Sequence, residues 1–175
     1  MSDRIADFET HVKAVAATLE RVASTPTAVC AAVEKAAGAG ARIVLGSDEF
    51  LPAEIWKGLR ELPGVIAQPS DEQLSTADAG ISGAFAGVAS SGSVCIAMGP
   101  PLAAAASLLM PLHVVLVSPE RIVERPRDLF DPGCLGGEAL RRDIVFITGP
   151  SATADMGPLV RGVHGPHRLH ILLLG

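Results

Sequence analysis

Short apolar runs recur along the chain and alternate with segments of helical pattern. Runs of this length that are rich in valine, isoleucine and leucine predict strands buried on both faces. We expect six or seven such strands, at residues 41–46, 64–68, 79–83, 94–98, 112–118, 144–149 and 169–175. Strands that alternate with helices predict an α/β fold with a mostly parallel sheet flanked by helices.

The first 38 residues carry helical signals. One helical stripe runs through residues 2–23 and consists of Ile5, Phe8, Val12, Val15 and Leu19. Thr25 followed by Pro26 predicts the start of a second helix, because a threonine cap and a proline in the first turn both favour that position. We therefore expect a helical segment over about residues 1–38, followed by an α/β core over about residues 41–175.

Length and charge limit the class of protein. A chain of 175 residues is enough for one domain with a hydrophobic core, and a single domain is expected. Its net charge of −5 and the absence of basic tracts argue against nucleic acid as a partner. The longest apolar stretch, residues 102–117, is shorter than a membrane span, and the acidic N-terminus does not resemble a signal peptide. These features predict a cytoplasmic protein with no membrane association.

Three loops rich in glycine, serine and threonine follow predicted strands, at residues 46–49, 87–93 and 148–155. In an open α/β sheet, ligands collect at the carboxyl ends of the strands, so the three loops predict a pocket at that edge. A helix starting near Ala152 would direct free amide groups at an anion there. The alternative is that Ser151, Thr153 and Asp155 only cap the backbone.

Named catalytic motifs are absent from these loops. The chain has no GxxxxGK[ST], no GxGxxG and no G-x-S-x-G, so neither a nucleotide-binding loop nor a serine hydrolase is predicted. Cys30, Cys95 and Cys134 are too scattered to hold an iron–sulfur cluster and are expected to be reduced thiols. Cys30 and Cys95 are expected to be buried.

The histidines do not form a metal-binding pattern. His164, His167 and His170 are separated by Gly165-Pro166 and a predicted strand, and no acidic residue lies among them, so we expect no metal site. His113, inside an apolar strand, is expected to be a core histidine with its hydrogen bonds satisfied.

Several segments together resemble the LUD-domain family. The segment ITGPSATAD (residues 147–155), followed by LVRGVHGPHRLHILLL (residues 159–174), resembles the C-terminal signature of that family. Residues 77–94 are similar to its central motif, and residues 108–123 to the next segment. The resemblance covers about residues 77–175 and is closest to the small C-type lactate utilization members.

The resemblance implies a fold like that of the sugar-phosphate isomerase and coenzyme A transferase superfamily. It also implies a role in oxidising L-lactate to pyruvate beside two partner proteins that carry the iron–sulfur clusters, with no cofactor in this chain. Where the family motif commonly reads Ala-Glu-Thr-Gly-Thr, this chain has Ala89-Ser90-Ser91-Gly92-Ser93, so Ser90 replaces a carboxylate that could act as nucleophile or base.

The remaining candidates for a site are hydroxyl groups, backbone amides, one guanidinium and one imidazole. The predicted ligand-binding residues are Ser90, Ser91, Gly92, Ser93, Thr148, Gly149, Ser151, Thr153 and Arg161. Arg161 can bind a carboxylate, or alternatively pair with a surface acid. His164 is the candidate for proton transfer, because an imidazole titrates near neutral pH, although its ring could instead brace the Gly165-Pro166 turn.

Three functional hypotheses follow. The first is an accessory protein of lactate utilization that binds a small anionic metabolite. The second is an enzyme resembling a coenzyme A transferase or isomerase, acting on a small carboxylated or phosphorylated metabolite with His164 and Asp155 as the acid–base pair. The third is a regulator that senses a small acid. Homo-oligomer formation is left open by the sequence.

Overall fold

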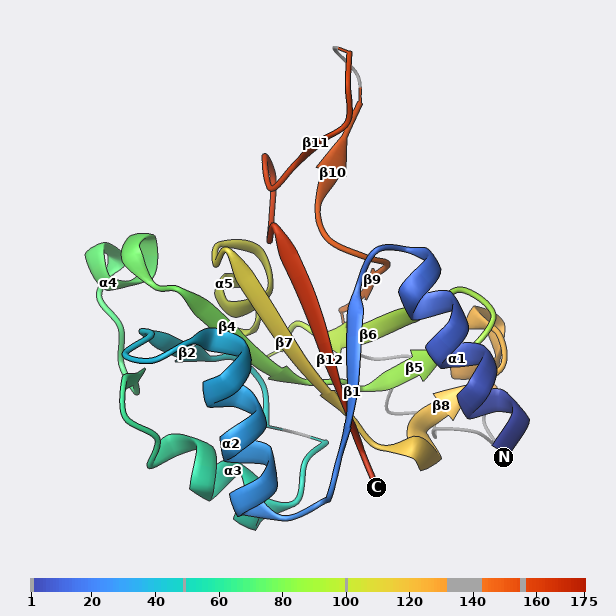
Figure 1. The fold of residues 1–175 in the computed structure, drawn as a ribbon, viewed down its shortest axis with the longest axis horizontal. Coiled ribbons are helices and arrows are strands. Elements are labelled where there is room, and N and C mark those ends of the chain that lie inside the picture. Colours follow the sequence, from blue (N-terminus) through green and yellow to red (C-terminus); the bar gives the residue numbers. More distant parts are fainter. Residues whose placement is uncertain (1, 49, 100, 132–142, 155–156) are drawn as a thin grey trace.

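The computed structural model describes residues 2–48, 50–99, 101–131, 143–154 and 157–175. These residues form an α/β structure with two sheets (Figure 1). The helices are α1 (Ser2–Ala14), α2 (Pro26–Ala37), α3 (Ala53–Arg60), α4 (Asp71–Thr76) and α5 (Ala103–Leu108), with short 3-10 turns at Pro119–Arg121 and Pro126–Phe130. None of the described helices is long and apolar enough to cross a membrane.

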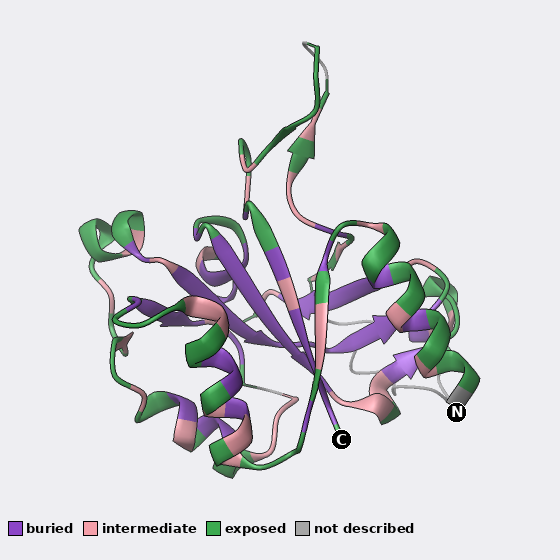
Figure 2. Cartoon of the chain, viewed as in Figure 1, coloured by how far each residue is buried: buried purple, intermediate pink, exposed green. Residues whose placement is uncertain are grey.

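The main sheet has six strands in the order β1-β12-β7-β4-β2-β3, and every pairing within it is parallel. Its strands are β1 (Thr18–Val22), β2 (Ile43–Leu45), β3 (Val65–Ile66), β4 (Ala79–Gly83), β7 (Leu112–Val117) and β12 (Arg168–Leu174). The predicted α/β class, with a mostly parallel sheet flanked by helices, is confirmed. Figure 2 shows that β4 and β7 are buried along their length, as their apolar sequences predict.

The second sheet has four strands in the order β8-β5-β6-β9, which the sequence analysis did not separate from the main sheet. Its strands are β5 (Ala86–Val88), β6 (Ser93–Ala97), β8 (Ile122–Val123) and β9 (Ile144–Ile147). β6 pairs antiparallel with both β5 and β9, so the strand predicted at residues 144–149 belongs to this sheet. A two-stranded hairpin of β10 (Ala152–Thr153) and β11 (Val160–Arg161) extends away from the body (Figure 1).

Two cores cover the two faces of the main sheet. On one face, alternate residues of β4, β7 and β12 pack against apolar side chains of α2 and α3, such as Val33 and Leu59. On the other face, the intervening residues pack against α1 and β6, for example through Phe8 and Ile96. Helix α5 covers β4 on this second face so closely that a Cβ at Gly80 would lie 1.9 Å from the Ala106 carbonyl oxygen.

The N-terminal segment is not helical throughout, so that expectation is wrong in part. The apolar stripe predicted over residues 2–23 includes Leu19, but helix α1 ends at Ala14. Leu19 lies in β1, at one edge of the main sheet. The predicted start of the second helix is confirmed: the Thr25 hydroxyl accepts a hydrogen bond from the Ala28 amide, and Pro26 begins α2.

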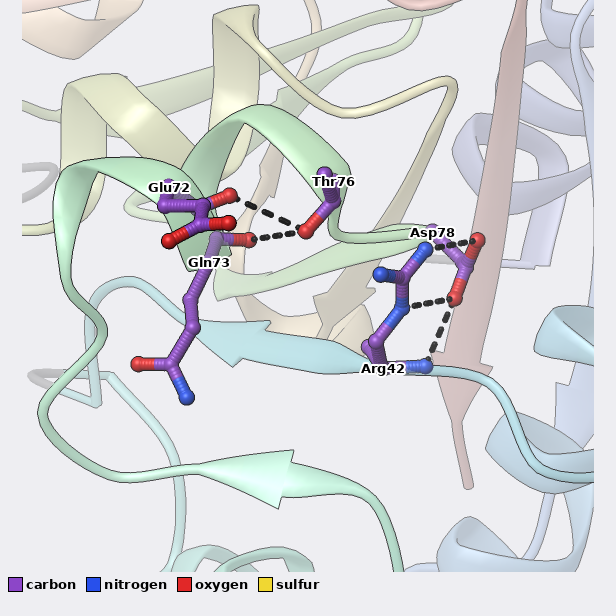
Figure 3. Close-up of polar contacts among 5 residues, drawn as sticks. All are labelled: Arg42, Glu72, Gln73, Thr76 and Asp78. Carbon is purple, nitrogen blue, oxygen red and sulfur yellow. Dashed lines mark hydrogen bonds and ion pairs between the residues drawn. The ribbon is translucent and has the colours of Figure 1, made fainter.

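An arginine–aspartate pair joins the starts of two strands at the amino-terminal edge of the main sheet (Figure 3). Asp78, before β4, accepts bonds from the Arg42 amide at 2.8 Å and from the Arg42 guanidinium at 3.1 and 3.3 Å. These bonds from Arg42 lower the pKa of the Asp78 carboxyl. The same edge carries the cavities described next.

Candidate functional site

Two turns that are far apart in the sequence meet at the amino-terminal ends of β7 and β12. The first turn, residues 147–152, follows β9, and the second turn, residues 164–166, precedes β12. Both turns line a cavity of about 370 Å³. The amide of Ser151 donates to the carbonyl of Pro166 at 2.9 Å, which holds the two turns together. We call this the turn cavity; its other lining residues are Ser107, Leu108, His113, Val145, Phe146 and Leu169.

The location of this cavity differs from the prediction. The three glycine- and serine-rich loops were expected together at the carboxyl edge of the sheet, but the turn cavity lies at the opposite edge. Only the loop at residues 46–48 lies at the carboxyl edge, where the Ser47 carbonyl accepts a bond from the Gly83 amide. The expected helix near Ala152 is also wrong, because this residue begins strand β10.

Four of the predicted site residues lie at the turn cavity: Thr148, Gly149, Ser151 and His164. Two others connect to it through a chain of hydroxyl groups. The oxygens of Ser91 and Ser93 lie 2.7 Å apart, and Ser93 Oγ is 2.7 Å from Thr148 Oγ1. The turn between β5 and β6 is therefore linked to the turn after β9.

The two predicted glycines serve close packing against α1 and the residue after it. Gly92 has φ +64°, and a Cβ there would lie 2.4 Å from the Val12 amide nitrogen. Gly149 has φ +74°, and a Cβ there would lie 2.2 Å from the Val15 carbonyl oxygen. A side chain at either position would meet both steric overlap and an unfavourable backbone conformation.

The remaining predicted site residues lie elsewhere. Ser90 is exposed in the turn between β5 and β6, and neither Ser90 nor Thr153 lines the turn cavity. Asp155 lies outside the described residues, so the proposed pair with His164 has no described geometry. No carboxylate is among the described residues that line the turn cavity.

Arg161 lies at a second cavity, of about 290 Å³, which also borders the amino-terminal end of β12. We call it the basic cleft; it is lined by Ala16, Thr18, Glu20, Lys35, Ala36, Leu112, Arg161, His167, Arg168, Leu169 and His170. His167 and His170 were considered in the sequence only as metal ligands, and no cluster of histidine, cysteine or acidic residues suited to a metal occurs within the described ranges.

His113 was predicted only as a core histidine, but it also lines the turn cavity. It is fully buried, and its Nε2 lies 3.1 Å from Ser82 Oγ. Its Nδ1 has no hydrogen-bond partner among the described residues, so the expected fully satisfied core histidine is only half satisfied. A buried polar atom without a partner is costly and requires an explanation.

The cysteines agree in part with the expectation of buried thiols. Cys95 is buried in the second sheet, and burial raises the pKa of its thiol to about 12. Cys30 is only partly buried, and Cys134 lies outside the described residues.

The fold and the site define an α/β protein with ligand-sized cavities at one edge of a parallel sheet. A model of the LUD domain family matches residues 57–174. The chain therefore belongs to the LUD domain family, which confirms the resemblance and extends it toward the N-terminus.

Relatives with related sequences include two curated proteins. An uncharacterized protein of Neisseria meningitidis serogroup B is 31% identical over 104 residues, which cover 59% of this chain and 45% of that protein. Lactate utilization protein C of Deinococcus radiodurans is 29% identical over 114 residues, which cover 61% of this chain and 50% of that protein. The chain thus spans about half the length of these relatives.

One solved structure shares the fold. The crystal structure of a DUF162 family protein from Deinococcus radiodurans matches with a TM-score of 0.72 and 21% identity, and the match covers 99% of this chain and 98% of that one. At this identity the match supports the fold alone.

Burial of His113 predicts a measurable acid sensitivity. Burial lowers the pKa of the imidazole from 6.5 to about 3, because the charged ring is poorly solvated in the core. The unfolded chain takes up this proton near pH 6.5 and the folded protein does not, so stability is lost as the pH falls between these values. The free energy of unfolding should decrease by up to about 1.4 kcal/mol per pH unit from this group alone.

Urea unfolding at several pH values between 6 and 4 tests this expectation. His113→Gln should have the shallower pH dependence, whereas His164→Gln, at an exposed position, should keep the slope of the parent. Equal slopes for His113→Gln and the parent would contradict it.

Proposed function

We propose that this chain acts in lactate utilization as an accessory protein that binds a small carboxylate metabolite in the turn cavity. Membership of the LUD domain family and the similarity to lactate utilization protein C of Deinococcus radiodurans support the role. The observation that carries the proposal is that Thr148, Ser151 and His164 share one cavity with the half-satisfied His113.

The chemistry of the turn cavity suits a small 2-hydroxy or 2-oxo acid. The hydroxyl groups of Thr148 and Ser151 can donate to carboxylate oxygens, and the exposed His164 ring can donate a further hydrogen bond. Apolar side chains such as Leu108 and Leu169 offer contacts to a methyl group. A volume of about 370 Å³ falls at the lower end of the range for small-molecule sites.

The redox step itself belongs to other components in this proposal. The three cysteines of the chain have no cluster-binding spacing, and the sequence carries no flavin or nicotinamide motif. We therefore propose that the protein works beside the iron–sulfur proteins that the family resemblance implies. The enzyme hypothesis based on His164 and Asp155 stays a prediction, because Asp155 lies outside the described residues.

Calorimetric titration with L-lactate and pyruvate tests ligand binding. His164→Gln should weaken the affinity for L-lactate about tenfold, the usual effect of losing one hydrogen bond to a charged group. His167→Gln is the matched control, because His167 lines the basic cleft instead, and it should bind L-lactate as the parent does. Absence of any binding, or equal loss in both variants, would contradict the proposal.

Deletion of the gene in the native host tests the role in the cell. The deletion strain should grow poorly on L-lactate as carbon source and normally on other carbon sources. Extracts of the strain should oxidise L-lactate more slowly, and a plasmid copy should restore the rate. Unchanged growth on L-lactate, together with an unchanged rate in extracts, would remove the assignment.

A further inference from the structure

The basic cleft lies on the other face of the main sheet from the turn cavity. His170 shares its face of β12 with Leu172 and Leu174, which pack in the core under α2, whereas Leu169 packs in the core on the α1 side. The cleft is formed by the starts of β1 and β12 together with Lys35 of α2 and Arg161 of β11. It is therefore a second cavity, and among the described residues only Leu169 lines both cavities.

The charges that line the cleft are unbalanced. Arg161 and Arg168 are exposed and form no ion pair within the described ranges. Glu20 is the only carboxylate among the described residues that line the cleft, and Lys35 Nζ binds its two oxygens at 3.0 and 3.2 Å. Two positive charges remain in excess at this place, in a chain whose net charge is −5.

Neutral hydrogen-bonding groups accompany these charges. His170 Nδ1 lies 2.7 Å from the Thr18 hydroxyl, and His170 Nε2 has no partner among the described residues. Burial is the main cause that lowers the pKa of the His170 imidazole; the Glu20 charge raises this pKa, and the charges of Lys35 and Arg168 lower it. His170 Nε2 is thus a buried hydrogen-bonding atom, without a described partner, beside the positive charges of the cleft.

We propose that the basic cleft binds the phosphate group of a small phosphorylated metabolite. Two guanidinium groups present planar forks that match phosphate oxygens, and a group with two negative charges gains more from the charge excess than a carboxylate does. This site is additional to carboxylate binding in the turn cavity and uses different polar side chains. A polyanion such as nucleic acid would be repelled by the overall negative charge of the protein.

Titration calorimetry with inorganic phosphate and with glycerol phosphate tests the proposal. The parent protein should bind both, and more weakly as sodium chloride is added. Arg161→Gln and Arg168→Gln should each weaken the affinity at least tenfold. Arg127→Gln, which removes an exposed arginine paired with Asp128, is the matched control and should stay within twofold of the parent.

A second measurement separates the cleft from the turn cavity. The imidazole signals of His170 in NMR spectra should shift when phosphate is added to the parent and should not shift in Arg168→Gln, which is expected to keep the parent's circular dichroism spectrum. Arg168→Gln should bind L-lactate like the parent, and His164→Gln should bind phosphate like the parent. No phosphate binding by the parent, or parental phosphate affinity in Arg168→Gln, would overturn the proposal.

Discussion

The position of β12 between β1 and β7 is the constraint on which the rest of the structure depends. This last strand pairs in parallel on both sides, so its backbone groups are satisfied over its length and its apolar side chains enter the cores on both faces. Because β12 runs parallel to both neighbours, the segment that precedes it must reach the amino-terminal edge of the sheet. That requirement brings the turns at residues 147–152 and 164–167 to the places where the two cavities form.

The turn cavity lies at the amino-terminal edge because β9, the strand before its first turn, belongs to the second sheet. A strand of the main sheet at residues 144–149 would have delivered the following loop to the carboxyl edge. Instead β9 pairs antiparallel with β6 in the second sheet, and the chain leaves it next to the end of α1. Gly149 permits this approach, since any side chain there would collide with the Val15 carbonyl. The glycine that suggested a ligand cradle is therefore needed for packing.

Much of the fold could be predicted from the sequence because buried parallel strands are apolar without interruption. The ranges expected for β4, β7 and β12 agree closely with the structure. Strand β1 was missed because it is an edge strand with exposed polar residues, and Leu19 happens to continue the helical stripe of α1. The division into two sheets was missed because apolar runs do not specify their partners.

The candidate site could be predicted only in part. The residues at 148–151 and His164 were found because glycine, hydroxyl and imidazole groups are unusual beside apolar strands. His113 was recognised as buried, but its missing hydrogen-bond partner depends on the environment of one ring nitrogen, which no sequence pattern encodes. In the basic cleft, Lys35 and Arg168 line one cavity although more than a hundred residues of chain separate them, and spacing along the sequence gives no sign of that arrangement.

The most direct test of this account is to map which residues of the protein contact bound L-lactate. Isotope-filtered nuclear Overhauser measurements with labelled L-lactate can identify the protons nearest to its methyl group. The account predicts contacts from the methyl group to Leu108 and Leu169, which line the turn cavity at the amino-terminal edge of the sheet. Contacts to residues 46–48 at the carboxyl edge, or contacts confined to the basic cleft, would contradict it.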